Sequence, residues 1–122
     1  MKKLFILLLV VACSEKKADV VATLLAPVAF EAKLNATENA LLLDVRTEEE
    51  VNTGIIEGAE NIVYDENFAS KLSSLEQRPI FVYCAAGGRS SKAASILREK
   101  GYEVFELDGG MRAWKDAGMP VK

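Results

Sequence analysis

Residues 80–90 read Ile-Phe-Val-Tyr-Cys-Ala-Ala-Gly-Gly-Arg-Ser, and this stretch decides the fold of the chain. Its first four residues are β-branched or aromatic and follow Pro79, which predicts a buried β-strand. The two glycines predict a tight turn. Residues 90–100 then predict a helix that places Ala93, Ala94 and Leu97 on one side and ends before Gly101 in a left-handed cap. The segment therefore predicts a strand, a loop that begins at Cys84, and a helix.

The same alternation of strand and helix continues on both sides of this segment. Apolar runs predict further strands over residues 20–24, 41–45, 61–63 and 104–107. Helices are predicted from Pro27, after Thr47 in a capping box with Glu50, over 68–75 and over 110–117. Strands separated by helices predict an α/β fold with a parallel sheet flanked by helices on both faces. Such folds place their sites beyond the carboxyl ends of strands, where Cys84 lies.

The composition excludes several classes of function. The chain has 122 residues, which supports one domain, with 15 basic and 18 acidic side chains and a net charge of -3. This balance argues against a nucleic-acid partner, which requires an excess of basic side chains. The chain contains no histidine, so Ser-His-Asp catalysis and imidazole metal ligands are excluded. We expect no metal and no cofactor.

The first residues predict a leader that is separate from the fold. Lys2 and Lys3 precede nine apolar residues, too few to cross a bilayer, which needs about 20. The segment 10–13, Val-Val-Ala-Cys, resembles the lipobox of bacterial lipoproteins, in which the cysteine is lipidated. We therefore expect a signal peptide over 1–12, lipidation of Cys13, a tether over 13–19 and one domain over 20–122. The alternative is ordinary signal cleavage after residue 12.

The leader also predicts where the protein is located in the cell, and it leaves one cysteine with a free thiol. The resemblance implies a protein anchored in the cell envelope and facing the periplasm. The outer membrane is favoured because Ser14 lacks the aspartate that commonly retains lipoproteins at the inner membrane. If Cys13 carries lipid, Cys84 is the single remaining thiol, which marks it as a candidate reactive cysteine.

The loop after the central strand carries features that favour a thiolate. The following helix directs its positive dipole end toward Cys84, and Arg89 adds a positive charge. Gly87 and Gly88 allow several N–H groups to converge on one point. We expect the amides of residues 85–89, namely Ala85, Ala86, Gly87, Gly88 and Arg89, to bind the substrate sulfur. The alternative is a buried structural cysteine followed by glycines that only turn the chain.

Three stretches make the chain similar to single-domain rhodaneses. They are Leu42-Leu43-Asp44-Val45-Arg46, then Glu50 with Gly54, Ile56, Gly58, Ala59, Asn61 and Ile62, and finally Cys84-x-x-Gly87-x-Arg89-Ser90 with Gly109-Gly110 and Trp114 in register. The resemblance implies a sulfurtransferase in which Cys84 accepts a sulfane sulfur as a persulfide and yields it to cyanide or a thiol. Thiosulfate, polysulfide and persulfides are the expected donors, and the neutral Ala85 and Ala86 weaken the case for thiosulfate.

Two alternatives and one departure accompany this resemblance. Cysteine phosphatases of the same fold carry five residues between cysteine and arginine, whereas this loop carries four, which suits a single sulfur atom better than phosphate. The other alternative is a non-catalytic sulfide or polysulfide carrier, or a partner-docking module, at the membrane. The family commonly has histidine where this chain has Ile55, so the resemblance does not predict the structural role of this position.

Three more residues are candidates for supporting roles. Asp44 and Arg46 follow a buried strand and either line the mouth of the site or form a structural network in which Arg46 pairs with Glu50. Trp114 either walls the pocket or belongs to the core. Arg89 either attracts anionic donors while it holds the loop, or forms only a salt bridge.

Overall fold

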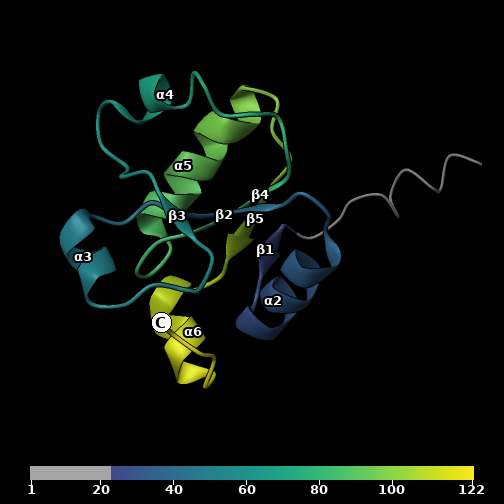
Figure 1. The fold of residues 1–122 in the computed structure, drawn as a ribbon, viewed down its shortest axis with the longest axis vertical. Helices are drawn as coiled ribbons and strands as arrows, with labels where there is room; N and C mark the ends of the chain where they lie inside the picture. Colours follow the sequence, from purple (N-terminus) through teal and green to yellow (C-terminus); the bar gives the residue numbers. More distant parts are fainter. Residues whose placement is uncertain (1–22) are drawn as a thin grey trace, which may run out of the picture.

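The computed structural model describes residues 23–122, so the expectations for the signal peptide, for Cys13, for the tether and for the start of the first strand lie outside the described residues. Strands and helices alternate along the described part of the chain (Figure 1). They are β1 (Leu24–Leu25), α2 (Pro27–Ala36), β2 (Leu41–Asp44), α3 (Glu48–Asn52), β3 (Glu60–Asn61), α4 (Phe68–Lys71), β4 (Ile80–Tyr83), α5 (Gly88–Glu99), β5 (Val104–Leu107) and α6 (Gly110–Asp116).

The strands form one parallel sheet in the order β1-β5-β4-β2-β3. Helices α4 and α5 cover one face, and α2 and α6 cover the other (Figure 1). The predicted α/β class, with a parallel sheet flanked by helices on both faces, is therefore confirmed. β4 lies at the centre, paired with β2 and β5, and all four of its residues are buried. A strand covered on both faces is mostly apolar, which explains why β4, and β2 up to its last residue Asp44, read as apolar runs.

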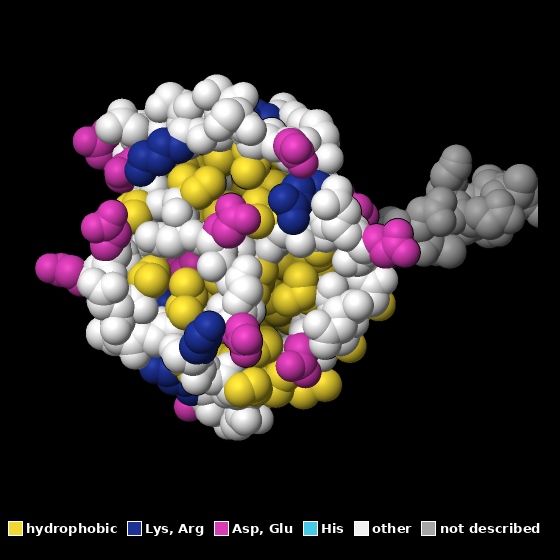
Figure 2. Space-filling model, in the orientation of Figure 1, with side chains coloured by type: hydrophobic (Ala, Val, Ile, Leu, Met, Phe, Trp, Pro, Cys, Tyr) yellow, Lys and Arg dark blue, Asp and Glu magenta, His cyan; other side chains and the backbone are white. Residues whose placement is uncertain are grey.

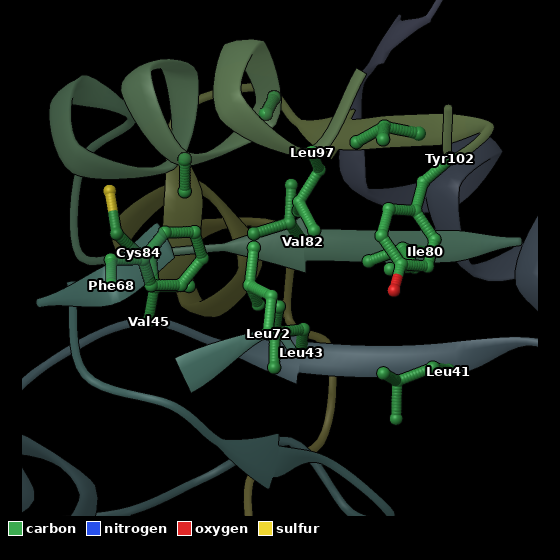
Figure 3. Close-up of a cluster of buried hydrophobic side chains, with 13 residues drawn as sticks. Leu41, Leu43, Val45, Phe68, Leu72, Ile80, Val82, Cys84, Leu97 and Tyr102 are labelled. Carbon is green, nitrogen blue, oxygen red and sulfur yellow. The ribbon is translucent and has the colours of Figure 1, made fainter. Parts of the chain in front are cut away.

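Two hydrophobic cores lie on the two faces of the sheet. Alternate residues of β2 and β4 point to opposite faces, so Leu43 and Val82 join the core under α5 while Phe81 packs on the other side. Figure 3 shows the first core, with Cys84 at one end of it. In the second core the rings of Phe30 and Phe105 contact Phe81, with ring centroids 5.5 and 4.8 Å away. Cys84 therefore belongs to the face covered by α4 and α5.

Some element boundaries differ from those predicted. α4 ends at Lys71 instead of residue 75, because the N–H groups of Leu72 and Leu75 bond to carbonyls three residues back, which makes turns and not an α-helix. β3 covers Glu60–Asn61 instead of 61–63. α5 begins at Gly88, two residues earlier than predicted. No helix among residues 23–122 combines the length and the hydrophobicity needed to cross a membrane.

Candidate active site

Cys84 comes directly after β4, at the carboxyl end of the sheet. The loop that follows is tied to α6 by its carbonyl groups: Met111 N–H donates to Cys84 O at 2.8 Å, and Arg112 N–H donates to Ala85 O at 3.0 Å. Gly87, with φ of 118°, precedes the first turn of α5 in a left-handed conformation that favours glycine. Because the loop carbonyls are bound to α6, the loop amides remain for the sulfur.

The Cys84 sulfur is buried and accepts a hydrogen bond from the loop. The side chain is 1% exposed, and Gly87 N–H donates to Sγ at 3.0 Å. Figure 3 shows the sulfur directed toward the ribbon of α5. Burial alone raises the pKa of a thiol, but the polar groups beside the sulfur outweigh it. They are the Ser90 hydroxyl, which itself donates to Gly87 O at 3.3 Å, and the amides of Ser90, Gly87 and Ala86. The pKa of Cys84 is therefore lowered, which favours the thiolate form of the sulfur.

One predicted amide bonds to the sulfur, and one residue of the loop motif without a predicted role, Ser90, lies beside it. Of the predicted amides, that of Gly87 bonds to the sulfur, that of Ala86 contributes to the lowered pKa of Cys84, and Gly88 begins α5 behind them. Ser90 belongs to the loop motif but had no predicted role, although its side chain is buried and its hydroxyl contributes to the lowered pKa of Cys84. The position of Ser90 in the first helical turn after the glycines was the feature of the sequence that could have predicted this role.

Arg89 makes a bidentate ion pair with Glu50 on α3. Its Nη1 and Nη2 atoms lie 2.7 and 3.0 Å from the two carboxylate oxygens, and each side chain is about one-third exposed. Hydrogen bonding to Arg89 lowers the pKa of Glu50 to about 2, and the same pair raises the pKa of Arg89. Glu50 also completes the predicted capping box with Thr47. The charge of Arg89, at the end of the active-site loop, is therefore paired with the charge of Glu50.

The predicted pairing of Arg46 with Glu50 is wrong. Arg46 instead bonds to Asp44 at 2.8 Å, inside the protein, where Asp44 is fully buried and Arg46 is 4% exposed. Arg46 also donates to Gly54 O, and Tyr83 Oη accepts a bond from Ile56 N–H at 3.1 Å. Asp44 and Arg46 thus form a structural network, because a carboxylate two residues away at the buried end of β2 is a closer partner than one on the next helix.

The segment around Ile55 is fixed by main-chain bonds. Ile55 N–H donates to Lys122 O at 3.2 Å, and Lys122 N–H donates back to Ile55 O at 2.8 Å. Together with the bonds from Arg46 and Tyr83, this pairing holds the loop in which the chain departs from the rhodanese signature. The backbone around Ile55 is therefore held by the C-terminal residue and by the side chains of Arg46 and Tyr83.

Trp114 lies in the core on the face opposite Cys84, as the core alternative predicted. Its Nε1 donates to Pro120 O at 2.8 Å, and its ring borders a cavity of about 340 Å³ between α2 and the C-terminal residues.

A different cavity, of about 260 Å³, adjoins the active-site loop at Ala86 and Gly87. Among residues 23–122, no group of three or more acidic, cysteine or histidine side chains is placed to hold a metal ion.

The chain is similar to known proteins along most of its length. Residues 27–117 match the family model described as Rhodanese-like domain. A sulfurtransferase of Allochromatium vinosum is 34% identical over 91 residues, which cover 73% of this chain and 84% of that protein. The thiosulfate sulfurtransferase GlpE of Shewanella oneidensis is 34% identical over 87 residues, 70% of this chain and 85% of that protein.

The fold of the chain is also similar to that of a solved structure. The rhodanese-like domain of an Anabaena protein, determined by solution NMR, superposes with a TM-score of 0.70 at 36% identity, covering 84% of this chain and 80% of that one. The match of fold and sequence extends over the strand, loop and helix that hold Cys84. The chain therefore belongs to the rhodanese-like domain family, in which several of its relatives are named sulfurtransferases.

Proposed function

We propose that this protein is a sulfurtransferase that carries sulfane sulfur on Cys84. The supporting observation is a buried thiol at the carboxyl end of β4, with a lowered pKa and the Gly87 N–H donating to its sulfur. Preorganised donors of this kind stabilise negative charge on a sulfur atom without reorganising during the reaction. The sulfurtransferase relatives support the same reaction class.

The proposed reaction has two displacement steps at sulfur. The Cys84 thiolate attacks the outer sulfur of thiosulfate, the S–S bond of the donor breaks, and sulfite leaves with the bonding electron pair. A persulfide donor reacts in the same way and releases its thiolate, and a polysulfide releases a chain shorter by one sulfur. Cyanide or a thiolate then attacks the outer sulfur of the Cys84 persulfide, which releases thiocyanate or a new persulfide and restores the Cys84 thiolate. Neither step requires a histidine to move a proton.

Turnover with defined donors tests this proposal. Purified protein is incubated with thiosulfate, polysulfide or a persulfide, with cyanide or a thiol as acceptor, and thiocyanate or sulfide is measured. We expect turnover by the wild type, loss of turnover in Cys84→Ser, and an added mass of one sulfur atom on the wild-type protein before acceptor is added. Equal turnover by wild type and Cys84→Ser would contradict the mechanism. A stable added sulfur atom with negligible turnover would instead indicate the carrier function.

We further propose that the protein is lipidated at Cys13 after removal of residues 1–12, and that it acts at the envelope facing the periplasm. The support is the lipobox-like segment at residues 10–13. Cys13→Ala, or treatment of cells with globomycin, should leave an unprocessed or soluble form. Unchanged processing together with unchanged membrane partition of the Cys13→Ala variant would contradict this proposal.

A further inference from the structure

The loop at Cys84 contains one charged side chain. Residues 84–89 comprise the nucleophile, two alanines, two glycines and Arg89. The raised pKa of Arg89 comes first from its hydrogen bonds to Glu50, and the Cys84 thiolate contributes to it as well. An unpaired guanidinium at this place would attract anionic sulfur donors, because the electrostatic interaction of two charges grows as their separation falls.

That charge is balanced by Glu50. Both carboxylate oxygens bond to the guanidinium at 2.7 and 3.0 Å, so the pair presents little net charge to a molecule that approaches the sulfur. Glu50 is itself held in place, because it accepts a bond from Thr47 N–H in the capping box. The first turn of α3 also carries Glu48 and Glu49, both exposed, which add negative charge to this side of the loop.

Other cations near the loop are more weakly placed. Lys92 on α5 and Arg112 on α6 are exposed, and neither makes an ion pair within residues 23–122. Water and salt screen such exposed charges, so each acts on a bound donor less than a guanidinium within the loop itself. On the face shown in Figure 2, basic side chains of the described residues are scattered singly and do not gather into a patch.

We infer that Glu50 determines the charge preference of the Cys84 site, and that the site favours persulfides whose organic part carries no negative charge over anionic donors such as thiosulfate. This inference rests on the proposed function and specifies its substrate class. In the reaction, the Cys84 thiolate attacks the outer sulfur of R–S–SH, the donor S–S bond breaks, and R–S⁻ leaves while the proton stays on the transferred sulfur. A cationic or uncharged R group approaches the Glu50–Arg89 pair and the acidic turn of α3 without electrostatic penalty.

Alkylation of Cys84 tests the charge at the sulfur without requiring sulfur transfer. Iodoacetate and iodoacetamide have similar size but differ by one negative charge, so the ratio of their rate constants reports the local potential. Glu50→Gln keeps an acceptor for Thr47 N–H and for Arg89 but removes the charge. We expect the iodoacetate-to-iodoacetamide ratio to rise about threefold to tenfold in this variant.

Matched variants make the result specific. Glu49→Gln removes the same charge from the same helix without touching Arg89, and its ratio should change less than about twofold. Arg89→Gln leaves the Glu50 carboxylate unbalanced, so its ratio should fall below that of the wild type even if Glu50→Gln folds poorly. An equal ratio in Glu50→Gln and Glu49→Gln, with no fall in Arg89→Gln, would overturn the inference.

Donor specificity provides the functional measurement. The wild type should use cysteamine persulfide with a higher kcat/KM than 3-mercaptopropionate persulfide, which is similar in size but anionic, and Glu50→Gln should reduce that preference at least about threefold. A preference for the anionic donor that Glu50→Gln does not alter would contradict the inference while leaving the sulfurtransferase function intact. Absence of turnover with every donor would contradict the proposed function, and the alkylation ratios would still decide the role of Glu50.

Discussion

A Cβ atom on Gly110 would lie 2.5 Å from the carbonyl oxygen of Cys84, a distance that real Cβ contacts do not reach. Gly110 has a φ of 60°, and the next two residues of α6 donate their N–H groups to the carbonyls of Cys84 and Ala85. The glycine therefore lets the start of α6 approach the active-site loop closely enough to hold its carbonyl groups. The amides of the loop are left to face the sulfur.

Gly110→Ala should destabilise the protein by about 2 to 4 kcal/mol, because the new methyl group meets backbone atoms that cannot move aside and the left-handed conformation adds strain. Alkylation of Cys84 at neutral pH should slow in the same variant, since the loop must shift. Gly118→Ala is the matched control: Gly118 also has a positive φ, 77°, but no atom lies within 4 Å of its Cβ position. Chemical denaturation measures both variants, and equal losses would refute the close-packing explanation.

Arg46→Met should cost about 3 to 5 kcal/mol, because it leaves the fully buried Asp44 carboxylate without its partner. The double variant Asp44→Asn with Arg46→Met should lose less than the two single losses combined, since asparagine removes the charge and still accepts the bond from the N–H of residue 46. Urea denaturation of the wild type, both single variants and the double variant measures this coupling. Additive losses would show that the ion pair does not act as a unit.

Deletion of residues 119–122 should lower stability by about 1 to 3 kcal/mol, because it removes the paired main-chain bonds between Ile55 and Lys122 and the acceptor of the Trp114 indole. A shorter deletion of residues 121–122 keeps Pro120 and should lose only part of that amount. Thermal unfolding distinguishes the two. No loss in either deletion would mean that Arg46 and Tyr83 suffice to hold the loop at Ile55.

Ser90→Ala should slow alkylation of Cys84 at neutral pH severalfold to about tenfold, because the hydroxyl that helps to lower the pKa of Cys84 is lost. Since the rate follows the thiolate fraction, the midpoint of the pH–rate profile should move to higher pH. Ser91→Ala changes an exposed hydroxyl on the next residue and should leave the profile unchanged. The same midpoint in wild type and Ser90→Ala would exclude the hydroxyl as a donor to the sulfur.

The parts of the fold that were predictable are those in which local sequence and burial agree. The apolar runs of β2 and β4 are buried on both faces, Ala93, Ala94 and Leu97 face the sheet from α5, and Gly101 has the positive φ of a helix cap. The position of Cys84 followed from the same pattern, because a loop after a central parallel strand opens at the carboxyl edge. The ends of β3 and α4 were not predictable, since short elements depend on contacts more than on propensity.

The partner of Arg89 could not be read from the sequence. Glu50 lies 39 residues away, and its capping box with Thr47 identifies only a helix start. Arg46 was the predicted partner of the Glu50 carboxylate, and Arg89 takes that place because Asp44 satisfies Arg46 inside the protein. The identity of the carboxylate that pairs with Arg89 is therefore determined by the tertiary structure.

The Glu50–Arg89 pair should also appear in the acid stability of the protein. The pKa of Glu50 is lowered from 4.5 to about 2 in the folded chain, first by the bond to Arg89. A carboxyl whose pKa is lower in the folded than in the unfolded state stabilises the fold above its unfolded pKa and loses that stabilisation as it becomes protonated. The Glu50 contribution should therefore be complete above about pH 5 and disappear between pH 4.5 and 2. Because both side chains are about one-third exposed, solvent screening limits it to roughly 1 kcal/mol.

Glu50→Gln should thus be less stable than the wild type at pH 7, and the difference should shrink toward zero as the pH falls through this window. Urea denaturation at intervals from pH 7 to pH 2 measures it. Glu49→Gln is the control, because Glu49 is exposed and makes no ion pair within the described chain, so its stability should run parallel to that of the wild type. A difference between Glu50→Gln and wild type that stays constant with pH would show that the loss comes from packing or capping. The charge of the pair would then contribute nothing measurable to the fold.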